Sequence, residues 1–186
     1  MSAALASSIP GYKAGTWSID PTHSEISFSI RHLAISKVKG KFENFDATFV
    51  TAENPLESTV TASAEVVSIN TNESNRDGHL RTGDFFDAEQ FPHITFTSTG
   101  ARHEGGEFKV DGELTIKGTT LPVTFDFDFG GFGTDPYGNY KAGFTATTVV
   151  KRESFGLTWN APLEAGGFLL GADVTITLDI QAALNA

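Results

Sequence analysis

The chain has 186 residues, no cysteine and a formal net charge of −10, and its 16 phenylalanines far outnumber its tryptophans and tyrosines. One domain of this length can bury a substantial core, and the lack of cysteine excludes disulfides and thiolate chemistry. The negative charge argues against nucleic-acid binding and against docking on an anionic membrane, because both need clustered lysine and arginine.

The first residues show neither the basic start nor the long apolar run of a secretory signal, and no later segment is long enough to span a bilayer. We therefore expect a cytoplasmic protein without stable membrane insertion. A flexible lead-in over residues 1–14 is predicted to precede a single domain over residues 15–186.

After the lead-in, polar and apolar residues alternate through most of the chain, which predicts strands with one buried face. A change of phase between Phe42 and Phe45 predicts a bulge at Glu43–Asn44. In the stretch GEFKVDGELTIK, Phe108, Val110 and Leu114 share one face, and the GTT that follows predicts a hairpin turn. The eight predicted strands cover about residues 16–33, 38–51, 57–69, 93–103, 106–117, 121–129, 139–152 and 174–180.

Residues 70–90 break the alternation and predict a short helix that caps one end of the fold. They contain NRDGHLRTGDFFD, with Leu80, Phe85 and Phe86 as a lid. Arg76, His79 and Arg81 would then surround the opening and bind a phosphate, pyrophosphate or quinone oxygen. Alternatively, the two arginines pair with neighbouring aspartates and only hold the helix to the barrel. Residues 153–171 are rich in glycine and proline, which predicts a loop.

Long antiparallel strands with one apolar face can close into a barrel or split into a sandwich, and periodicity does not choose between them. An eight-stranded barrel is just wide enough to be filled by side chains or to hold one slim ligand.

Several segments in order give the sequence its family resemblance. They are WSIDPTHSEISFSIRH from Trp17, VKGKFENF from Val38, RDGHLRTGDFFD from Arg76, FPHITFTST, LTIKGTTLPVTF, and a late RESFGLTW. This set resembles the YceI-like family of polyisoprenoid-binding proteins over about residues 12–184.

The resemblance implies an extended, eight-stranded, antiparallel lipocalin-like barrel that binds and transports a long isoprenoid or other amphipathic lipid without catalysis. No cofactor is implied beyond a bound lipid such as polyprenyl pyrophosphate, ubiquinone or menaquinone. Family members are often periplasmic or secreted, and they often pair, so a homodimer contacting through the loop at 153–171 is one expectation.

Strand parity and ring size predict which residues line the lumen. The predicted lumen residues are Ile26, Phe28, Ile30, Phe42, Phe45, Leu80, Phe85, Phe86, Phe96, Phe108, Leu114, Phe125, Phe127, Phe144, Trp159 and Phe168, with Val110, Phe129, Tyr140 and Phe155 as further candidates. The predicted contacts to the polar head are His32, Arg76, His79 and Arg81. Glu43 and Asn44 are predicted to face a polar stretch of the cavity.

Neither metal binding nor nucleophilic catalysis has a supporting motif. His23 and His32 lie about 30 Å apart along one strand with opposite parity, so they cannot share a metal. Asp20, His23 and Ser24 are close in sequence, but adjacent strand residues point to opposite faces and cannot form a working pair. The leading interpretation is a lipid carrier. The alternatives are an enzyme acting on an isoprenoid lipid and a filled-barrel interaction protein.

Overall fold

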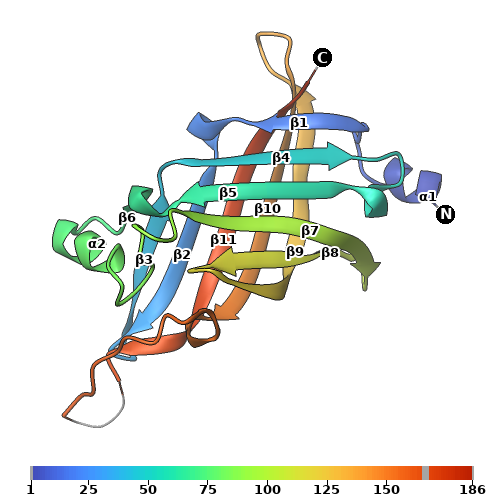
Figure 1. The fold of residues 1–186 in the computed structure, drawn as a ribbon. Coiled ribbons are helices and arrows are strands. Elements are labelled where there is room, and N and C mark those ends of the chain that lie inside the picture. The colour runs from blue at the N-terminus through green and yellow to red at the C-terminus, as the bar shows by residue number, and fades with distance from the viewer. Residues whose placement is uncertain (1, 165–167, 186) are drawn as a thin grey trace.

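The computed structural model describes residues 2–164 and 168–185, and more than half of them lie in β-strands (Figure 1). The strands are β1 (Gly15–Ile19), β2 (Glu25–His32), β3 (Ser36–Phe42), β4 (Phe45–Thr51), β5 (Thr59–Glu65), β6 (Ile69–Asn70), β7 (His93–Glu104), β8 (Glu107–Ile116), β9 (Thr119–Thr134), β10 (Tyr140–Lys151) and β11 (Leu170–Leu184). The helices are α1 (Ser2–Ser7), α2 (Ser74–Leu80) and the short 3-10 helices η1 (Pro21–His23), η2 (Pro55–Glu57), η3 (Val66–Ser68) and η4 (Arg152–Phe155). Within these ranges, no helix is long and apolar enough to cross a membrane.

The strands close into an antiparallel barrel. Their order around it is β1–β4–β5–β7–β8–β9–β10–β11, and β11 pairs back with β1, placing Leu184 opposite Trp17. Closure pairs the two edges that a long open sheet would leave exposed. The predicted eight-stranded antiparallel barrel is confirmed, and the sandwich is excluded.

Three of the predicted long strands are each interrupted once. The first becomes β1 and β2 on either side of η1, and both pieces pair with β11. Beyond the closed ring, β2 pairs with β3, and β3 pairs with β6. In Figure 1, β1, β4, β5 and β7 cross the view while β10 and β11 run steeply behind them. The β2–β3 hairpin therefore projects beyond the ring at one end.

The predicted irregularity at Glu43–Asn44 separates β3 from β4. At this break the Glu43 amide donates to the Ser68 carbonyl at 3.1 Å, and the Glu65 amide donates to the Asn44 carbonyl at 2.9 Å. The break thus stays attached to the end of β5 and to η3 while the chain changes phase.

The β8–β9 hairpin shows why the predicted turn lies where it does. Lys117 and Gly118 have φ values of 51° and 77°, the left-handed pair that a tight two-residue hairpin turn requires. A Cβ atom at Gly118 would lie 2.6 Å from the Phe91 ring, so this turn also needs a residue without a side chain. Thr119 already pairs with Ile116 in the ladder.

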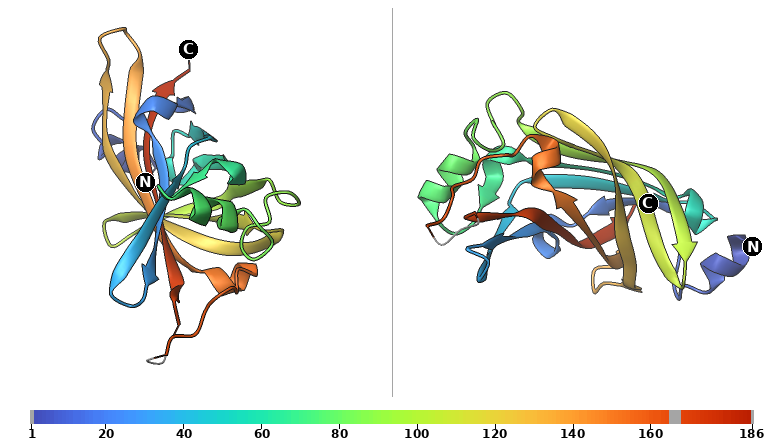
Figure 2. Two further views of the ribbon diagram at one scale, coloured as in Figure 1. Left: turned by 90° about the vertical axis from the view of Figure 1, so that its left-hand side faces the viewer. Right: turned by 90° about the horizontal axis from the view of Figure 1, so that it is seen from below.

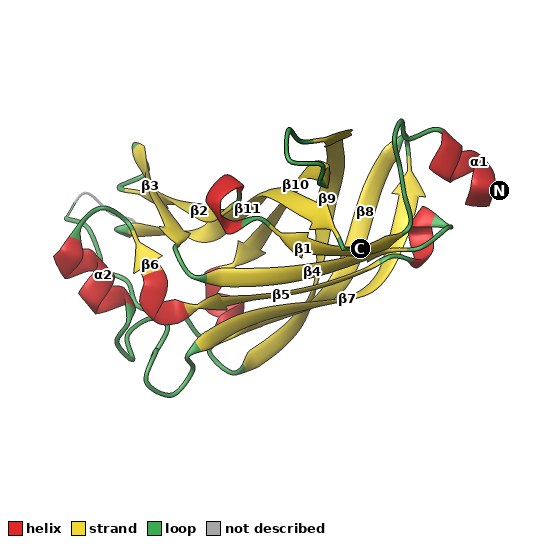
Figure 3. Ribbon diagram, turned by 90° about the horizontal axis from the view of Figure 1, so that it is seen from above, coloured by secondary structure: helices red, strands yellow, loops and turns green. Residues whose placement is uncertain are grey.

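The two ends of the barrel carry different elements (Figures 2 and 3). α2 lies at one end, and the segment after β10 runs toward it; α1 lies at the opposite end. At that opposite end, the Tyr12 hydroxyl donates to the Ala52 carbonyl and the Tyr140 hydroxyl donates to the Gly11 carbonyl, both at 2.6 Å. The lead-in therefore contains a short helix and is hydrogen-bonded to the barrel, and its flexibility stays a prediction.

Candidate functional site: an apolar cavity in the barrel

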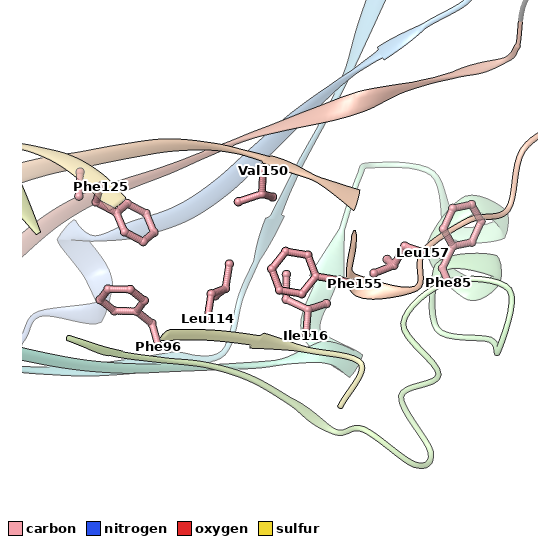
Figure 4. Packing of buried hydrophobic residues seen from close by; sticks show 9 residues of the cluster. Phe85, Phe96, Leu114, Ile116, Phe125, Val150, Phe155 and Leu157 are labelled. Carbon is pink, nitrogen blue, oxygen red and sulfur yellow. The ribbon is translucent and has the colours of Figure 1, made fainter. Parts of the chain in front are cut away.

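An apolar cavity of about 490 Å³ lies inside the barrel, toward the end that carries α2. Figure 4 shows Phe96 of β7 and Phe125 of β9 pointing toward each other, and their ring centroids lie 5.0 Å apart. The same view shows Leu114, Ile116 and Phe155 directed into the interior. A volume in this range is typical of a small-molecule site. The barrel is hollow, so the filled-barrel alternative does not describe it.

Most of the predicted lumen residues lie in the cavity wall because strand parity fixes which side chains point inward. They are Ile26, Phe28, Ile30, Phe42, Leu80, Phe85, Phe86, Phe96, Leu114, Phe125, Phe127, Phe144 and Trp159, joined by the further candidates Val110 and Phe155. Their contact with a ligand stays a prediction.

Four predicted site residues lie elsewhere. Phe45 packs against the cluster around Ile26 and Phe42 and does not line the cavity. Phe108 lines a second, smaller pocket farther along the barrel. Phe168 is 63% exposed. Arg81 donates from Nε to the Val67 carbonyl at 3.1 Å and from Nη2 to the Ile69 carbonyl at 3.3 Å, so it holds the cap to the barrel.

Two of the less prominent expectations also need correction. Glu43 and Asn44 are exposed and take no part in the wall. Among the further candidates, Phe129 lines the second pocket, and Tyr140 packs beside Trp17 at the α1 end.

The sequence prediction missed part of the wall that parity could have identified. Phe49 follows the inward parity of Phe45 and Ala47 along β4 and lines the cavity. On β11, Val174, Ile176 and Leu178 alternate with polar residues and also line it. The largest omission is Arg152, which has the inward parity of Phe144, Ala146 and Val150.

Among the polar side chains of the wall, those of His32, Asn75, Arg76 and His79 lie at the α2 end. The Arg76 guanidinium donates to the Thr71 hydroxyl at 2.7 Å and to the Thr71 carbonyl at 2.8 Å. Asp77 is buried behind it and accepts from the same Thr71 hydroxyl at 2.6 Å. Thr71 thus links Arg76 to Asp77, and among the described residues Arg76 forms no ion pair with an aspartate.

His79 connects the cap to the loop after β10. Its Nε2 lies 2.9 Å from an Asp84 carboxylate oxygen. Its ring meets those of Trp159 and Phe85 edge-on, with centroids 4.9 and 5.0 Å apart. These aromatic contacts close one side of the cavity between α2 and the loop.

Arg152 is 4% exposed and begins η4 directly after β10. Its Nε donates to the Gly171 carbonyl at 2.8 Å, and its Nη1 donates to the carbonyls of Leu157 and Trp159 at 2.6 and 2.9 Å. Its Nη2 is buried without a hydrogen-bond partner among the described residues. Burial lowers the pKa of the guanidinium from its ordinary value, but arginine stays charged at neutral pH. The wall therefore contains a buried cation with unused donors.

At the inner end of the cavity, Phe49, Phe127 and Phe144 form what we call the aromatic partition. The Phe49 and Phe144 centroids lie 4.4 Å apart, and Phe127 stacks on Phe144 at 5.0 Å. All three residues also line the second pocket, which has a volume of about 50 Å³. The partition therefore separates the main cavity from a short continuation toward the α1 end.

The residues of the DPTHSE stretch lie outside the cavity. His23 Nδ1 lies 2.8 Å from an Asp20 carboxylate oxygen, and the Ser24 hydroxyl donates to the Gln181 carbonyl at 3.1 Å. Across residues 2–164 and 168–185, no group of three or more metal-ligating side chains is placed to hold an ion.

An antiparallel eight-stranded barrel around an apolar cavity is a lipocalin-like binding fold. The model of the YceI-like domain family matches residues 17–182, and the chain belongs to this family. It is 42% identical over 172 residues to a UPF0312 protein of Staphylococcus aureus, and the match covers 91% of this chain and 98% of the relative.

Solved structures share the fold. BcnA of Burkholderia cenocepacia matches 88% of this chain and 98% of its own, with a TM-score of 0.77 at 21% identity. The Campylobacter jejuni YceI protein matches 84% of this chain and 91% of its own, with a TM-score of 0.72 at 28% identity. A polyisoprenoid binding domain from Saccharophagus degradans matches 93% of this chain and 100% of its own, with a TM-score of 0.69 at 15% identity.

Proposed function

We propose that this protein binds and carries a long-chain isoprenoid or similar amphipathic lipid, with the tail in the barrel cavity and the polar head at the α2 end. The observation that carries the proposal is the cavity of about 490 Å³ with its wall of phenylalanine and aliphatic side chains. Membership of the YceI-like family supports it, as does the fold shared with a domain described as polyisoprenoid binding.

The energetics favour a chain-like guest. Each methylene transferred from water into an apolar site contributes about 0.8 kcal/mol before binding costs. Some 20 buried carbons would nominally approach the practical ceiling of non-covalent affinity, about 18–21 kcal/mol. The driving force therefore does not limit tail length, and the position of the aromatic partition sets it.

The distribution of polar groups supports one orientation of the lipid. His32, Arg76, His79 and Arg152 all line the α2 end, whereas the inner end is formed by aromatic and aliphatic side chains. An oxygen of a phosphate, pyrophosphate or carbonyl head that reached Arg152 Nη2 would accept hydrogen bonds from its N–H groups, which have no partner among the described residues. The buried cation therefore favours a head group with hydrogen-bond acceptors, and it favours an anionic head group over a neutral one.

The cavity chemistry supports a non-catalytic role. Its serine and threonine hydroxyls belong to Ser27, Ser63 and Thr95. In the described part of the chain, the Ser27 hydroxyl donates to the Thr177 carbonyl, and no histidine or carboxylate hydrogen-bonds any of the three. Nucleophilic catalysis needs a base within hydrogen-bond reach of the nucleophile. Turnover of an isoprenoid pyrophosphate or a quinone, lost on substitution of His32 or Arg76, would instead support an enzyme.

Native mass spectrometry of freshly purified protein, followed by lipid extraction, tests the proposal. Ala146 lies in the cavity wall, so Ala146→Phe should block the tail. Val149 lies on the same strand but is 58% exposed, which makes Val149→Phe a matched control. We expect a homogeneous lipid in wild type and Val149→Phe that is absent from Ala146→Phe. Wild-type protein that neither retains lipid nor takes up an added polyprenyl phosphate would contradict the proposal.

A further inference from the structure

The β2–β3 hairpin carries a concentration of positive charge that the rest of the chain lacks. Four of the 13 lysines and arginines lie within residues 31–41, on a chain with a net charge of −10. In the hairpin register, Arg31 pairs with Lys37, and Lys39 and Lys41 pair with serines. All four basic side chains are exposed, and we call them the basic stripe.

The basic stripe differs from four other cations of the chain in having no acidic partners. Arg102, Lys109, Lys141 and Lys151 each form an ion pair with an aspartate. Among the described residues, none of the four stripe side chains pairs with a carboxylate. The acidic residues of the hairpin, Glu25 and Glu43, lie at the end away from the turn, where Lys41 is the nearest member of the stripe. Because exposed charges are screened within about 10 Å, the stripe presents a local positive surface despite the net charge.

The turn of the same hairpin exposes apolar side chains. Ile35 is 81% exposed and Leu33 is 38% exposed. Leu33 and Ala34 both have φ of 58°, a left-handed conformation that glycine or asparagine adopts with less strain. Exposed apolar residues in a strained turn do not serve the stability of the isolated barrel, which points to a role in contact with a partner.

This apolar tip adjoins the cavity. The Leu33 amide donates to the Leu169 carbonyl at 2.8 Å, and His32 pairs with Leu170. His32 and Val38 of the hairpin line the cavity, as do Leu169 and Leu170. The neighbouring Phe168 is strongly exposed and extends the apolar surface beside the turn. In Figure 1 the tip of the hairpin and the start of β11 lie together at the end of the barrel away from α1.

We propose that the β2–β3 hairpin docks this protein on an anionic membrane surface, with its apolar tip among the lipid headgroups and the basic stripe on the lipid phosphates. Lysine and arginine near such a surface are attracted to it, and exposed apolar side chains bury themselves at the headgroup boundary. Docking in this way places the end of the cavity lined by His32 and Leu169 beside the bilayer. The acidic remainder of the protein is repelled, which keeps the contact reversible and orients it. The inference deepens the proposed lipid-carrier function and rests on it.

Cosedimentation with vesicles tests the docking. We compare vesicles of phosphatidylcholine alone with vesicles containing equal parts of phosphatidylglycerol. Wild type should bind only the anionic vesicles, and raising the salt concentration should weaken binding. At about 1 kcal/mol per cation near the surface, the triple variant Lys37→Gln, Lys39→Gln, Lys41→Gln should bind about 100-fold more weakly. Ile35→Ser should also reduce binding without changing the charge.

The matched control removes the same number of charges elsewhere, as Lys109→Gln, Lys117→Gln, Lys151→Gln. These lysines lie on other strands and turns, so this variant should bind vesicles like wild type. Equal losses in the two triple variants would overturn the docking, as would wild type that fails to bind anionic vesicles at low salt. The latter result would assign the stripe to an acidic macromolecule instead.

Native mass spectra of the same preparations separate this inference from the proposed function. The triple stripe variant should keep the lipid content of wild type because none of its three substitutions lies in the cavity wall. If the protein contains lipid but does not bind vesicles, only the docking is refuted. Protein that takes up no lipid refutes the carrier function, whatever it does with vesicles.

Discussion

Arg152 Nη1 donates to the Trp159 carbonyl at 2.9 Å and so joins the end of β10 to the loop that supplies an aromatic wall residue. The same guanidinium holds the carbonyls of Leu157 and Gly171. A side chain with its donors in a rigid planar fork is suited to this task, and lysine cannot reproduce it. The wall of the cavity at this end therefore depends on one buried cation.

Replacing Arg152 with methionine should both destabilise the barrel and change its ligand preference. Three carbonyls lose their donor, a loss partly offset by removal of a buried charge, so we expect the free energy of unfolding to fall by about 2 kcal/mol. Affinity for a polyprenyl phosphate should fall about 10- to 100-fold, while affinity for the matching alcohol changes little. Urea unfolding and calorimetric titration measure the two effects. Arg152→Lys, which keeps the charge, should retain part of the phosphate preference; equal losses for phosphate and alcohol would leave Arg152 a structural role only.

Arg76→Ala tests whether the cap contributes to head-group binding. Arg76 lines the cavity, yet its guanidinium already donates to Thr71. If it also contacts the head, the variant should lose roughly tenfold in affinity for a charged-head lipid and much less for a headless one. Arg81→Ala is the control because Arg81 holds the same cap without lining the cavity. Parallel losses in both variants and for both ligands would show that Arg76 only holds the cap.

The lowered pKa of Asp20 predicts that the protein loses stability in acid. Its hydrogen bonds with His23, Thr22 and Lys141 hold the pKa of its carboxyl well below the usual value of about 3.9. Its contribution is therefore present above about pH 4 and is lost as the pH falls toward the folded-state pKa. We expect Asp20→Asn to lower the free energy of unfolding by about 1 kcal/mol at pH 7 and by less at pH 3. The effect is small because Asp20 and its partners lie near the surface. Thermal unfolding at both pH values measures this, with exposed Asp128→Asn as the charge control. A difference that is independent of pH would exclude the ionised carboxylate as its cause.

Sequence periodicity predicts the strands well because a period of two is a direct consequence of the pleat. It also locates the phase change between Phe42 and Phe45. It could not decide between a barrel and a sandwich, since both bury one face of each strand; the family resemblance supplied that choice. Likewise, α1 and the hydrogen bonds of the lead-in have no periodic signal, because they depend on side chains that approach from distant strands.

Strand parity has a further limit, which explains why some predicted lumen residues do not line the cavity. It tells which face a side chain takes, but not how far along the barrel it lies. Phe108 and Phe127 pair across β8 and β9 and both face inward, yet Phe108 lines only the second pocket. Phe168 lies outside the long predicted strands, where parity carries no information. Arg152 was missed although its parity was readable, because an arginine is seldom expected in an apolar wall.

The aromatic partition should determine the length of the bound chain. Phe144→Ala removes the ring that contacts both Phe49 and Phe127, and should join the main cavity to the pocket beyond. The variant should lose about 3–5 kcal/mol of stability. The mass of the bound lipid should shift to longer chains, since each further buried methylene adds about 0.8 kcal/mol. Phe129→Ala is the control, because Phe129 lines only the second pocket and its loss leaves the partition in place. Unchanged chain length in a folded Phe144→Ala protein, or the same lengthening in both variants, would show that something other than these rings stops the tail.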